Sequence, residues 1–414
     1  MGRQGREKNS ENTGIYIALM EQKPRKILIT TYHFTPEINA RAFRTFELAR
    51  EFARSGHKVV VYIPEYDFDF SGIVKKYGFD VKTVKTGFFL NRDSKKARKI
   101  SGEDKDPRDH MAVIRRFLRK TVISFIRRWI IEPFLCNHDL EYALTLRDSL
   151  LKDGGSYDLL ISIGLPFGVH LGSALAFGKN KALCARKVAD YGDPYSFNKT
   201  LRILPYHKYI EKYVLEKYDF ITVPVAEAVS SYTFFKPEKN IRVIPQGIDL
   251  DSVRTREYTE NTVPVFAYSG MFYRGARDPA GFMEYLRSLD RDFRFIVYTN
   301  KKDLFTMSCL GPFTKSLSGR LFIKPLLPRE ECIRELSKCD FLINIMNRTS
   351  NQRPSKLIDY GLAGRPVYSF KTDDFDPAVF EEFLNRDYSK SLKIDVFEYD
   401  IRKIAEKFLD LTRE

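Results

Sequence analysis

Residues 26–64, KILITTYHFTPEINARAFRTFELAREFARSGHKVVVYIP, contain the pattern that decides the fold. KILITTYHF is rich in β-branched and aromatic residues and carries no charge after Lys26, which is typical of a buried strand. From Arg41 to Arg54 apolar residues recur at helical spacing, and Gly56 follows where such a helix would end. KVVVYI then predicts a second strand. The stretch is therefore a βαβ unit, which implies a parallel sheet.

The same alternation of strands and helices recurs along the chain. Further strand-like stretches in the first half are YDLLISIG (157–164), KVADYG (187–192), YDFITVP (218–224) and IRVIP (241–245). The second half adds PVFAYSG (264–270), FRFIVYTN (293–300), RLFIKPL (320–326), DFLINIM (340–346) and RPVYSF (365–370). We therefore predict an α/β protein with two Rossmann-like, doubly wound domains that face a central cleft. A ligand would bind in such a cleft, at the carboxyl ends of the strands.

Composition shifts along the chain suggest the domain boundaries. The expected parts are a flexible tail at 1–23, a first domain at 24–250, a linker at 251–262, a second domain at 263–394 and a C-terminal helix at 395–414. In one arrangement considered, that last helix packs back on the first domain.

Bulk composition narrows the class of protein. With 414 residues, 43% of them hydrophobic and 30% charged, the chain suits about two globular domains and is not expected to be disordered. No apolar run reaches the roughly 18 residues of a membrane span. The five cysteines are scattered without C-x-x-C spacing, which argues against disulfides and zinc and suits a reducing cytosol. The net charge of +15 indicates a negatively charged partner: nucleic acid, anionic lipid or a phosphorylated small molecule.

Between residues 88 and 139 the alternation lapses into a basic loop and an amphipathic insert. Residues 112–134 carry one apolar stripe and one basic stripe at helical spacing, with Trp129 at the apolar edge. Such a helix is typical of a membrane-surface element. It is equally explained as a helix that packs on its own domain with a solvated basic face.

The segment NQRPSKLIDYGLAGRPV (351–367) predicts a helix with an anion site at its start. Pro354 suits the first helical position and Gly364 the position just past the end. Unpaired N–H groups and the helix dipole, together with Ser355 and Lys356, favour a phosphate. Asp359 lies one turn further on, where a carboxylate accepts hydrogen bonds from vicinal hydroxyls. The alternative is an ordinary capped helix with a surface lysine and aspartate.

A second candidate, YSGMFYRGARDP (268–279), follows the first strand of the second domain. Gly270 permits close approach of the backbone, and Arg274 and Arg277 are suited to clamp a diphosphate. The stretch contains neither a P-loop nor a G-x-G-x-x-G motif.

PSKLIDYGLAGRPV resembles the PSKL-x-E-Y-x-x-x-G-x-P-V segment of family 4 glycosyltransferases, which are retaining enzymes of the two-Rossmann GT-B architecture. Other segments similar to that family are TPEINARAFRTFELAREFARSGHKVVVY, LLISIGLPFGVHLGSALAF, VADYGDPYS, KNIRVIPQGIDLD and FAYSGMFYRGARDP. The matches run in family order from about Lys26 to Phe370.

The resemblance implies roles for individual residues in binding a nucleotide-sugar donor. Donor-binding positions would be Gly270, Arg274, Arg277, Asn351, Ser355, Lys356, Leu357 and Asp359. Asp359 takes the place of the family's ribose-binding glutamate. Asn351 takes the place of a glutamate against the donor sugar.

Four residues are predicted to take part in catalysis: Asp193, His170, Arg274 and Lys356. Asp193, like Asp190, comes at the end of a predicted strand, where ligands bind in such sheets. His170 lies on the first turn of a predicted helix and points either to the cleft or into the sheet. Asn39 and Ala40 stand where the family has Gly-Gly in the first loop of the first domain.

The predicted function is retaining transfer of a sugar from a nucleotide-sugar to an acceptor hydroxyl, in surface polysaccharide or glycolipid assembly. The acceptor would be a polysaccharide or a lipid-linked molecule. The protein is expected in the cytoplasm, either free or bound peripherally at the inner membrane face. The resemblance implies no metal and no further cofactor. Two alternatives are a non-catalytic nucleotide-sugar-binding relative and a nucleotide-sugar epimerase on the same fold. Specific nucleic-acid binding lacks any RNP, KH or helix-turn-helix signature.

Overall fold

The computed structural model divides the chain into two compact units, Met1–Gly247 with Ile401–Glu414, and Ile248–Asp400. The described residues are 23–37, 39–85, 139–198, 203–252, 255, 257–274, 277–346 and 356–414. Nearly all of the tail expected at 1–23, the insert expected at 88–139 and the helix predicted at 112–134 lie outside these ranges.

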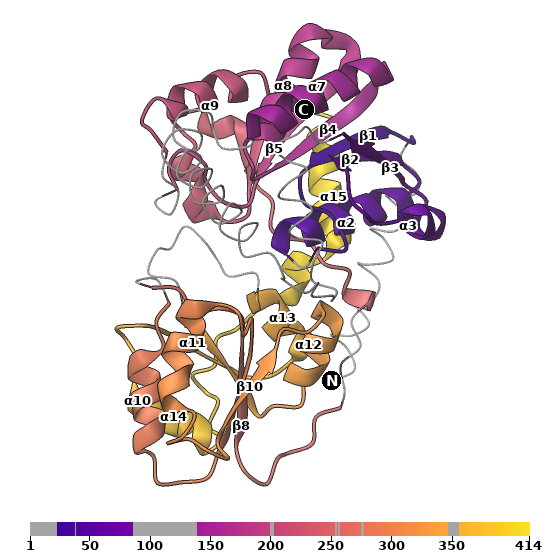
Figure 1. Cartoon of the computed structure of the whole chain (residues 1–414). Helices are drawn as coiled ribbons and strands as arrows, with labels where there is room; N and C mark the ends of the chain where they lie inside the picture. Colours follow the sequence, from indigo (N-terminus) through magenta and orange to yellow (C-terminus); the bar gives the residue numbers. More distant parts are fainter. Residues whose placement is uncertain are drawn as a thin grey trace, which may run out of the picture. The chain divides into compact units, whose positions relative to one another are not determined.

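The first unit is built on a parallel sheet of seven strands in the order β3-β2-β1-β4-β5-β6-β7 (Figure 1). The strands are β1 (Lys26–Thr31), β2 (Lys58–Pro64), β3 (Asp80–Val84), β4 (Tyr157–Gly164), β5 (Cys184–Tyr191), β6 (Phe220–Val223) and β7 (Ile241–Val243). In β1, Ile27 pairs with Val59 of β2 on one side and with Leu159 of β4 on the other. The strand order reverses direction between β1 and β4, which is the point where ligands bind in doubly wound sheets.

Helices cover both faces of this sheet. They are α2 (Ala40–Arg54), α3 (Ser71–Tyr77), α7 (Asp139–Asp153), α8 (Gly168–Lys179), α9 (His207–Leu215) and α15 (Ile401–Asp410). Because alternate residues of a strand point to opposite faces, Leu28 packs in the core under α7 and α8, while Ile27 and Ile29 pack in the core under α2 and α15. Figure 1 shows α7 and α8 on one side of the sheet and α2 and α15 on the other.

The C-terminal helix belongs to the first unit. Ile404 and Phe408 of α15 are fully buried and pack in the same core as Leu48 and Phe52 of α2. A Cβ at Gly247 would lie 2.4 Å from Ile401 Cδ1, so a larger residue there would have to displace the Ile401 side chain. The helix begins at Ile401 and is preceded by a short 3-10 helix, Val396–Tyr399, so it is shorter than the range predicted at 395–414.

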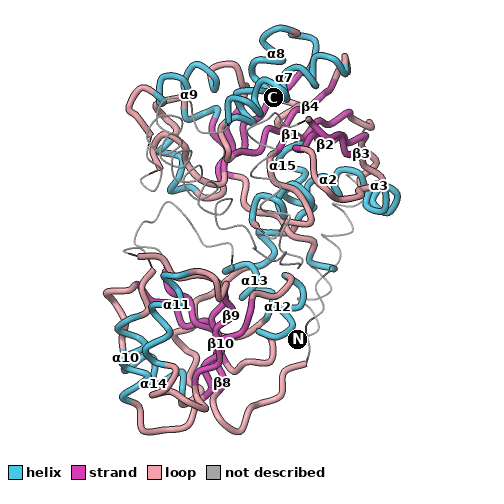
Figure 2. The backbone as a smooth tube through the Cα atoms, viewed as in Figure 1, coloured by secondary structure: helices cyan, strands magenta, loops and turns pink. Residues whose placement is uncertain are grey.

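The second unit has a parallel sheet of five strands in the order β10-β9-β8-β11-β12. Figure 2 labels three of them, β8, β9 and β10. The strands are β8 (Val265–Ser269), β9 (Arg294–Thr299), β10 (Leu321–Pro325), β11 (Phe341–Met346) and β12 (Val367–Lys371). The helices are α10 (Ala280–Ser288), α11 (Leu304–Leu310), α12 (Arg329–Leu336), α13 (Lys356–Ala363) and α14 (Pro377–Leu384). Phe266 packs in the core with residues of α10 and α14, and the next residue, Ala267, packs in the core with residues of α12 and α13.

The predicted α/β class with doubly wound parallel sheets is therefore confirmed in each unit. Among the described helices, none combines the length and the apolar character needed to cross a bilayer.

Candidate functional site

The loop after β8 turns back sharply at the carboxyl end of the strand. Gly270 has φ +128°, a conformation that favours glycine, and its N–H still donates to Tyr298 O of β9 at 2.9 Å. Beyond it, the backbones of Tyr273 and Arg277 exchange two hydrogen bonds of 3.0 and 2.8 Å. This closure directs Arg277 back toward β8, where the residue is only 8% exposed.

Lys356, the first residue of α13, places its ammonium group in the interior beside the same strand. It is 9% exposed, and its Nζ lies 3.9 Å from the centroid of the Tyr268 ring and 5.7 Å from that of Tyr360. Within the described ranges Nζ makes no hydrogen bond. Burial, and after it the charge of Arg277, lower the pKa of Lys356 well below 10.5. Ring faces compensate a buried cation only in part, so the arrangement favours an anionic ligand.

Tyr268 links the two cations. Its hydroxyl donates to Met271 O at 2.9 Å and interacts with the Arg277 side chain, and burial raises the pKa of Tyr268 to about 12. The Tyr360 hydroxyl accepts the N–H of Ser269 at 2.8 Å, which fixes α13 against the end of β8. Lys356, Arg277 and the first turn of α13 therefore converge on the carboxyl edge of the sheet, where a phosphate group binds most readily.

The other residues of α13 differ in their surroundings. The Leu357 side chain packs against the core, so only its backbone N–H suits the ligand contact predicted from the sequence. Asp359 Oδ1 accepts a 2.6 Å bond from Arg329 Nε of α12. Burial raises the pKa of Asp359, and Arg329 opposes that shift. The carboxylate predicted to bind ribose hydroxyls is therefore already held by an arginine.

Arg274, the other arginine of this loop, has an exposed side chain. Its guanidinium lies 5.5 Å from the centroid of the Phe305 ring and borders a depression of about 440 Å³. The lining is Phe272, Tyr273, Arg274, Asp303, Leu304, Phe305 and Ser308. Arg277 contacts Tyr268 and also lies 5.6 Å from the centroid of the Tyr273 ring, which lines the same depression as Arg274. Joint binding of one diphosphate by Arg274 and Arg277 stays a prediction. Asn351 and Ser355 lie outside the described residues.

In the first unit, Asp190 lies near the end of β5 and Asp193 follows the strand. Each accepts a hydrogen bond from an arginine of α2. Asp190 accepts bonds of 2.6 and 2.7 Å from Arg44 Nε and Nη2, and one of 2.6 Å from Thr222 Oγ1. This buried network joins α2 to β5 and β6. Asp193 accepts 2.7 Å from Arg41 Nη2, and both side chains are partly exposed. Of the two aspartate side chains, only that of Asp193 is exposed to solvent to a substantial extent.

The catalytic role predicted for His170 is not supported by its position. The residue is fully buried, and its Nδ1 lies 2.8 Å from Ser162 Oγ of β4. A Cβ at Gly164 would lie 2.3 Å from His170 Nε2, so the ring packs directly on the strand backbone. Burial lowers the pKa of His170 to about 3, so the imidazole stays neutral. Of the two orientations considered from the sequence, the structure has the one into the sheet.

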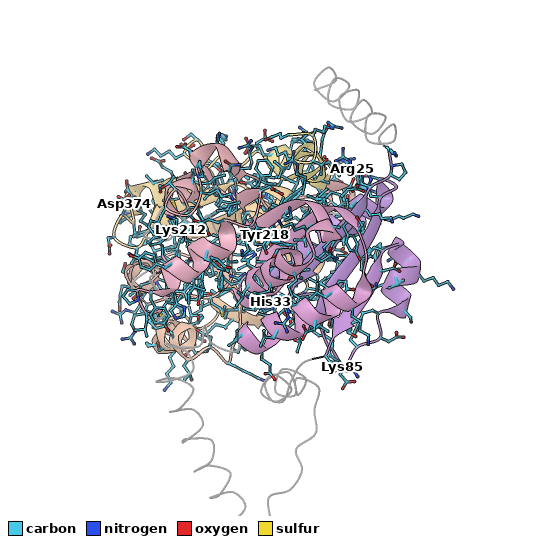
Figure 3. The ribbon with its side chains drawn as sticks, turned by 90° about the horizontal axis from the view of Figure 1, so that it is seen from above. Arg25, His33, Lys85, Lys212, Tyr218 and Asp374 are labelled. Carbon is cyan, nitrogen blue, oxygen red and sulfur yellow. The ribbon has the colours of Figure 1, made fainter. Side chains whose placement is uncertain are left out.

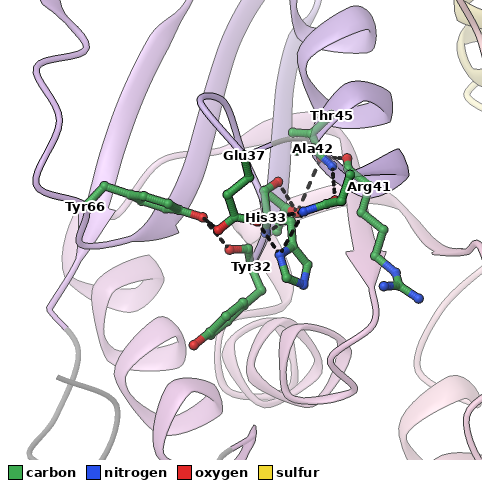
Figure 4. Close-up of polar contacts among 9 residues, drawn as sticks. Tyr32, His33, Glu37, Arg41, Ala42, Thr45 and Tyr66 are labelled. Atoms are coloured by element: carbon green, nitrogen blue, oxygen red, sulfur yellow. Dashed lines mark hydrogen bonds and ion pairs between the residues drawn. The ribbon is translucent and has the colours of Figure 1, made fainter. Parts of the chain in front are cut away.

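The loop between β1 and α2 contains a polar cluster that the sequence reasoning missed (Figure 4). Glu37 Oε2 lies 2.6 Å from His33 Nδ1 and accepts 2.8 Å from Asn39 Nδ2, while Glu37 Oε1 accepts 2.6 Å from the Tyr66 hydroxyl. Burial raises the pKa of Glu37, but the bonds from His33, Tyr66 and Asn39 outweigh it and the net pKa is lowered. An ionised Glu37 therefore orients the His33 ring through its contact with Nδ1.

Asn39 and Ala40 have structural roles in this loop. Asn39 Oδ1 accepts the Ala42 N–H at 2.9 Å and caps α2, and Ala40 O accepts 3.1 Å from Gln246 Nε2. The signal for the missed cluster was a histidine and a glutamate four residues apart, directly after a strand that ends at the ligand-binding edge of the sheet.

The arrangement of elements is that of the GT-B fold. No family model matches the sequence, and no curated protein sequence matches it significantly. Solved glycosyltransferases are similar in structure over nearly the whole chain, at identities that establish the fold alone.

TarM of S. aureus superimposes with a TM-score of 0.59 at 12% identity, covering 95% of this chain and 99% of that one. The catalytic domain of starch synthase IV from Arabidopsis thaliana gives 0.56 at 10%, covering 94% and 99%. A glycosyltransferase from Rickettsia africae ESF-5 gives 0.54 at 12%, covering 95% and 97%.

Proposed function

We propose that this protein is a retaining glycosyltransferase that moves a sugar from a nucleotide-sugar donor to an acceptor hydroxyl, in surface polysaccharide or glycolipid assembly. The observation that carries the proposal is the buried ammonium of Lys356, which makes no hydrogen bond within the described ranges and lies beside Arg277. The diphosphate of a nucleotide-sugar supplies the negative charge that this position favours.

In the proposed reaction the bond between the anomeric carbon and a diphosphate oxygen breaks as the acceptor oxygen bonds to that carbon from the same face. The acceptor proton passes to the departing diphosphate. Lys356, Arg277 and the N–H groups of α13 stabilise the charge that develops on the leaving group. No metal is required for this step. In this proposal Asp359 accepts from ribose hydroxyls while its Oδ1 keeps the bond from Arg329 Nε.

The first unit would bind the acceptor. Asp193 and the His33–Glu37 pair are accessible polar groups at the carboxyl ends of β5 and β1, and hydroxyl-rich acceptors suit such groups. A lipid-linked acceptor at the cytosolic membrane face agrees with the net charge of +15.

The similar structures support this choice of substrates. One TarM structure is described as a complex with Fondaparinux, alpha-GlcNAc-glycerol and UDP, and the starch synthase IV structure as bound to ADP and acarbose. Both pair a nucleoside diphosphate with a saccharide or a glycoside.

The test is turnover of a panel of UDP-, GDP- and CMP-sugars by the full chain, with product anomers assigned by NMR. We expect one donor class to be consumed, and Lys356→Met to lower kcat/KM about a hundredfold or more. Lys315→Ala, an exposed lysine of the same unit, is the matched control and should leave turnover unchanged.

Absence of turnover with every donor would contradict the enzyme assignment. If nucleotides still bound in that case, the non-catalytic nucleotide-sugar-binding alternative would replace it.

A further inference from the structure

Helix α9 presents a row of exposed tyrosines. Tyr206, at its N-cap, is 38% exposed, Tyr209 59% and Tyr213 61%. Their spacing of three and four residues places them on one side of the helix. The opposite side is buried: Val214 and Leu215 lie in the core of the first unit. The tyrosines therefore stand on a firmly anchored helix.

Two phenylalanines extend this row into a continuous surface. Phe234 is 39% exposed and Phe197 is 45% exposed. Ring centroids lie 6.1 Å apart for Tyr209 and Phe234, and 6.2 Å apart for Phe197 and Phe234. We call the surface formed by Phe197, Tyr206, Tyr209, Tyr213 and Phe234 the aromatic face.

Lysines flank the aromatic face. Lys208 Nζ lies 5.0 Å from the Tyr209 ring centroid and 5.7 Å from that of Phe234. Lys212 Nζ, labelled in Figure 3, lies 5.1 Å from the Phe234 centroid, and Lys217 Nζ lies 4.3 Å from the Tyr213 centroid.

The acids of α9 and its end do not cancel this charge. Glu211 is fully buried and accepts the Ser196 N–H at 3.0 Å, so it faces the core. Glu216 is exposed at the end of the helix. On α9 and at its end, three lysines therefore outnumber the one exposed glutamate.

We propose that the aromatic face binds the surface of an anionic lipid bilayer. Tyrosine rings favour the level of the lipid headgroups, and lysine stems lie along apolar surface while their ammonium groups reach the lipid phosphates. Each lysine near an anionic membrane adds to the attraction.

Two other occupants fit the face less well. A symmetric contact with a second copy would bring Lys208 and Lys212 against their own equivalents, which repel. Stacking of nucleic-acid bases needs free ring faces, whereas the ammonium groups of Lys208, Lys212 and Lys217 lie over the rings.

This inference rests on the proposed function for its setting, since a lipid-linked acceptor requires approach to a membrane. The binding itself is measured without activity, by flotation of the full chain with phosphatidylcholine vesicles that contain or lack phosphatidylglycerol. The variants are Lys208→Glu/Lys212→Glu and Tyr209→Ser/Tyr213→Ser. The control is Lys75→Glu/Lys76→Glu on α3, an equal charge change at exposed lysines of the same unit, one of which also lies over a tyrosine ring.

We expect the unaltered chain and the α3 control to float with the anionic vesicles only, and the α9 lysine variant to bind at least about 30-fold more weakly. The tyrosine variant should also bind more weakly, at low as well as high salt. Equal vesicle binding by all four proteins would overturn the proposal. So would unchanged vesicle binding together with a changed oligomeric mass or a lost affinity for single-stranded RNA in the α9 variants.

Donor turnover in the absence of vesicles separates the two proposals. Turnover retained by α9 variants that no longer float supports both. If no protein turned over a donor while flotation still depended on α9, the proposed function would fail and the aromatic face would stand.

Discussion

Lys356 places an amino group where burial makes its charged form costly. Its pKa is lowered by burial and by Arg277, so between that lowered pKa and 10.5 the unfolded chain binds a proton that the folded chain does not. Over this window the free energy of unfolding therefore rises with pH. We expect such a residue where a bound anion offsets the free-energy cost of burying the ammonium group.

Replacing Lys356 by methionine should stabilise the ligand-free protein. Methionine keeps the apolar stem against Tyr268 without the ammonium group, so we expect the free energy of unfolding near pH 7 to rise by about 1–3 kcal/mol. The gain should shrink as the pH approaches 10.5, the unshifted value for lysine. Urea unfolding of both proteins at several pH values measures this, and a clear destabilisation by methionine would show that Lys356 is a structural residue.

His170 is a buried basic group for which we expect a structural role and no role in turnover. Because burial lowers its pKa to about 3 from 6.5, stability is complete above pH 6.5 and is lost as the pH falls from 6.5 toward 3. His170→Asn preserves a polar atom for Ser162 and removes the titration. We expect a flatter acid-unfolding curve, with slopes that differ by up to about 1.4 kcal/mol per pH unit. Donor turnover per folded molecule should be unchanged, whereas a lost kcat with intact folding would restore a catalytic role.

The residues that come together at the candidate site were only partly predictable from the sequence. Gly270 follows the end of β8 and Lys356 begins α13, as the strand and helix patterns in the sequence indicate. The burial of Arg277 beside β8 depends on the backbone pairing of Tyr273 with Arg277, which no periodicity reveals. Asn351 and Ser355 remain predictions.

Among the elements, α9 combines an outer aromatic row with a buried acid. Glu211 is fully buried, and burial raises its pKa to about 7, against bonds from Ser196 and Tyr191 that lower it. A carboxyl group with a raised folded pKa contributes stability below its unfolded value of 4.5, and that contribution is lost as the pH rises through about 7.

Glu211→Gln should therefore raise Tm at pH 8 more than at pH 5. Glutamine keeps an acceptor for the Ser196 N–H but does not ionise. Thermal melts at the two pH values measure the difference, with Glu216→Gln at the exposed end of the same helix as the control. If both variants had the same pH dependence as the unaltered chain, Glu211 would not be the titrating group.

The strands were predictable because their apolar runs are bounded by glycine, proline and charge. The pattern PVFAYSG, for example, contains β8 (Val265–Ser269) with one extra residue at each end. Helix α9 was not among the elements expected from the sequence, although its residues are amphipathic at helical spacing. What the sequence does not show is that its tyrosines lie on the exposed side. Exposure of large rings is a property of the surface, and composition does not report it.

For the whole molecule, the main feature is the return of the chain to the first unit through α15. Phe408 is fully buried there, and Arg44 of α2 lies 5.5 Å from its ring centroid. Phe408→Ala should destabilise the first unit by about 3–5 kcal/mol. Hydrogen exchange should speed up in β1, β2 and α2 and stay unchanged in β8 to β12. Faster exchange in the second unit as well would show that the two units unfold together.

Two α/β halves were predictable from the alternation of elements on either side of residue 250. The bounds of α15 were not, because the turn of 3-10 helix at Val396–Tyr399 continues the helical pattern across the boundary between the units.

The central claim is that Lys356 belongs to a diphosphate site, and proton uptake on binding tests it most directly. An anion beside Lys356 raises the lowered pKa of the ammonium group, so UDP or GDP should bind with uptake of protons and with an affinity that falls as the pH rises. Calorimetric titrations in buffers of different ionisation enthalpy count the protons. The account predicts uptake of up to about one proton that disappears in Lys356→Met together with most of the affinity. Nucleotide binding that is equally tight and takes up the same number of protons in Lys356→Met would contradict it.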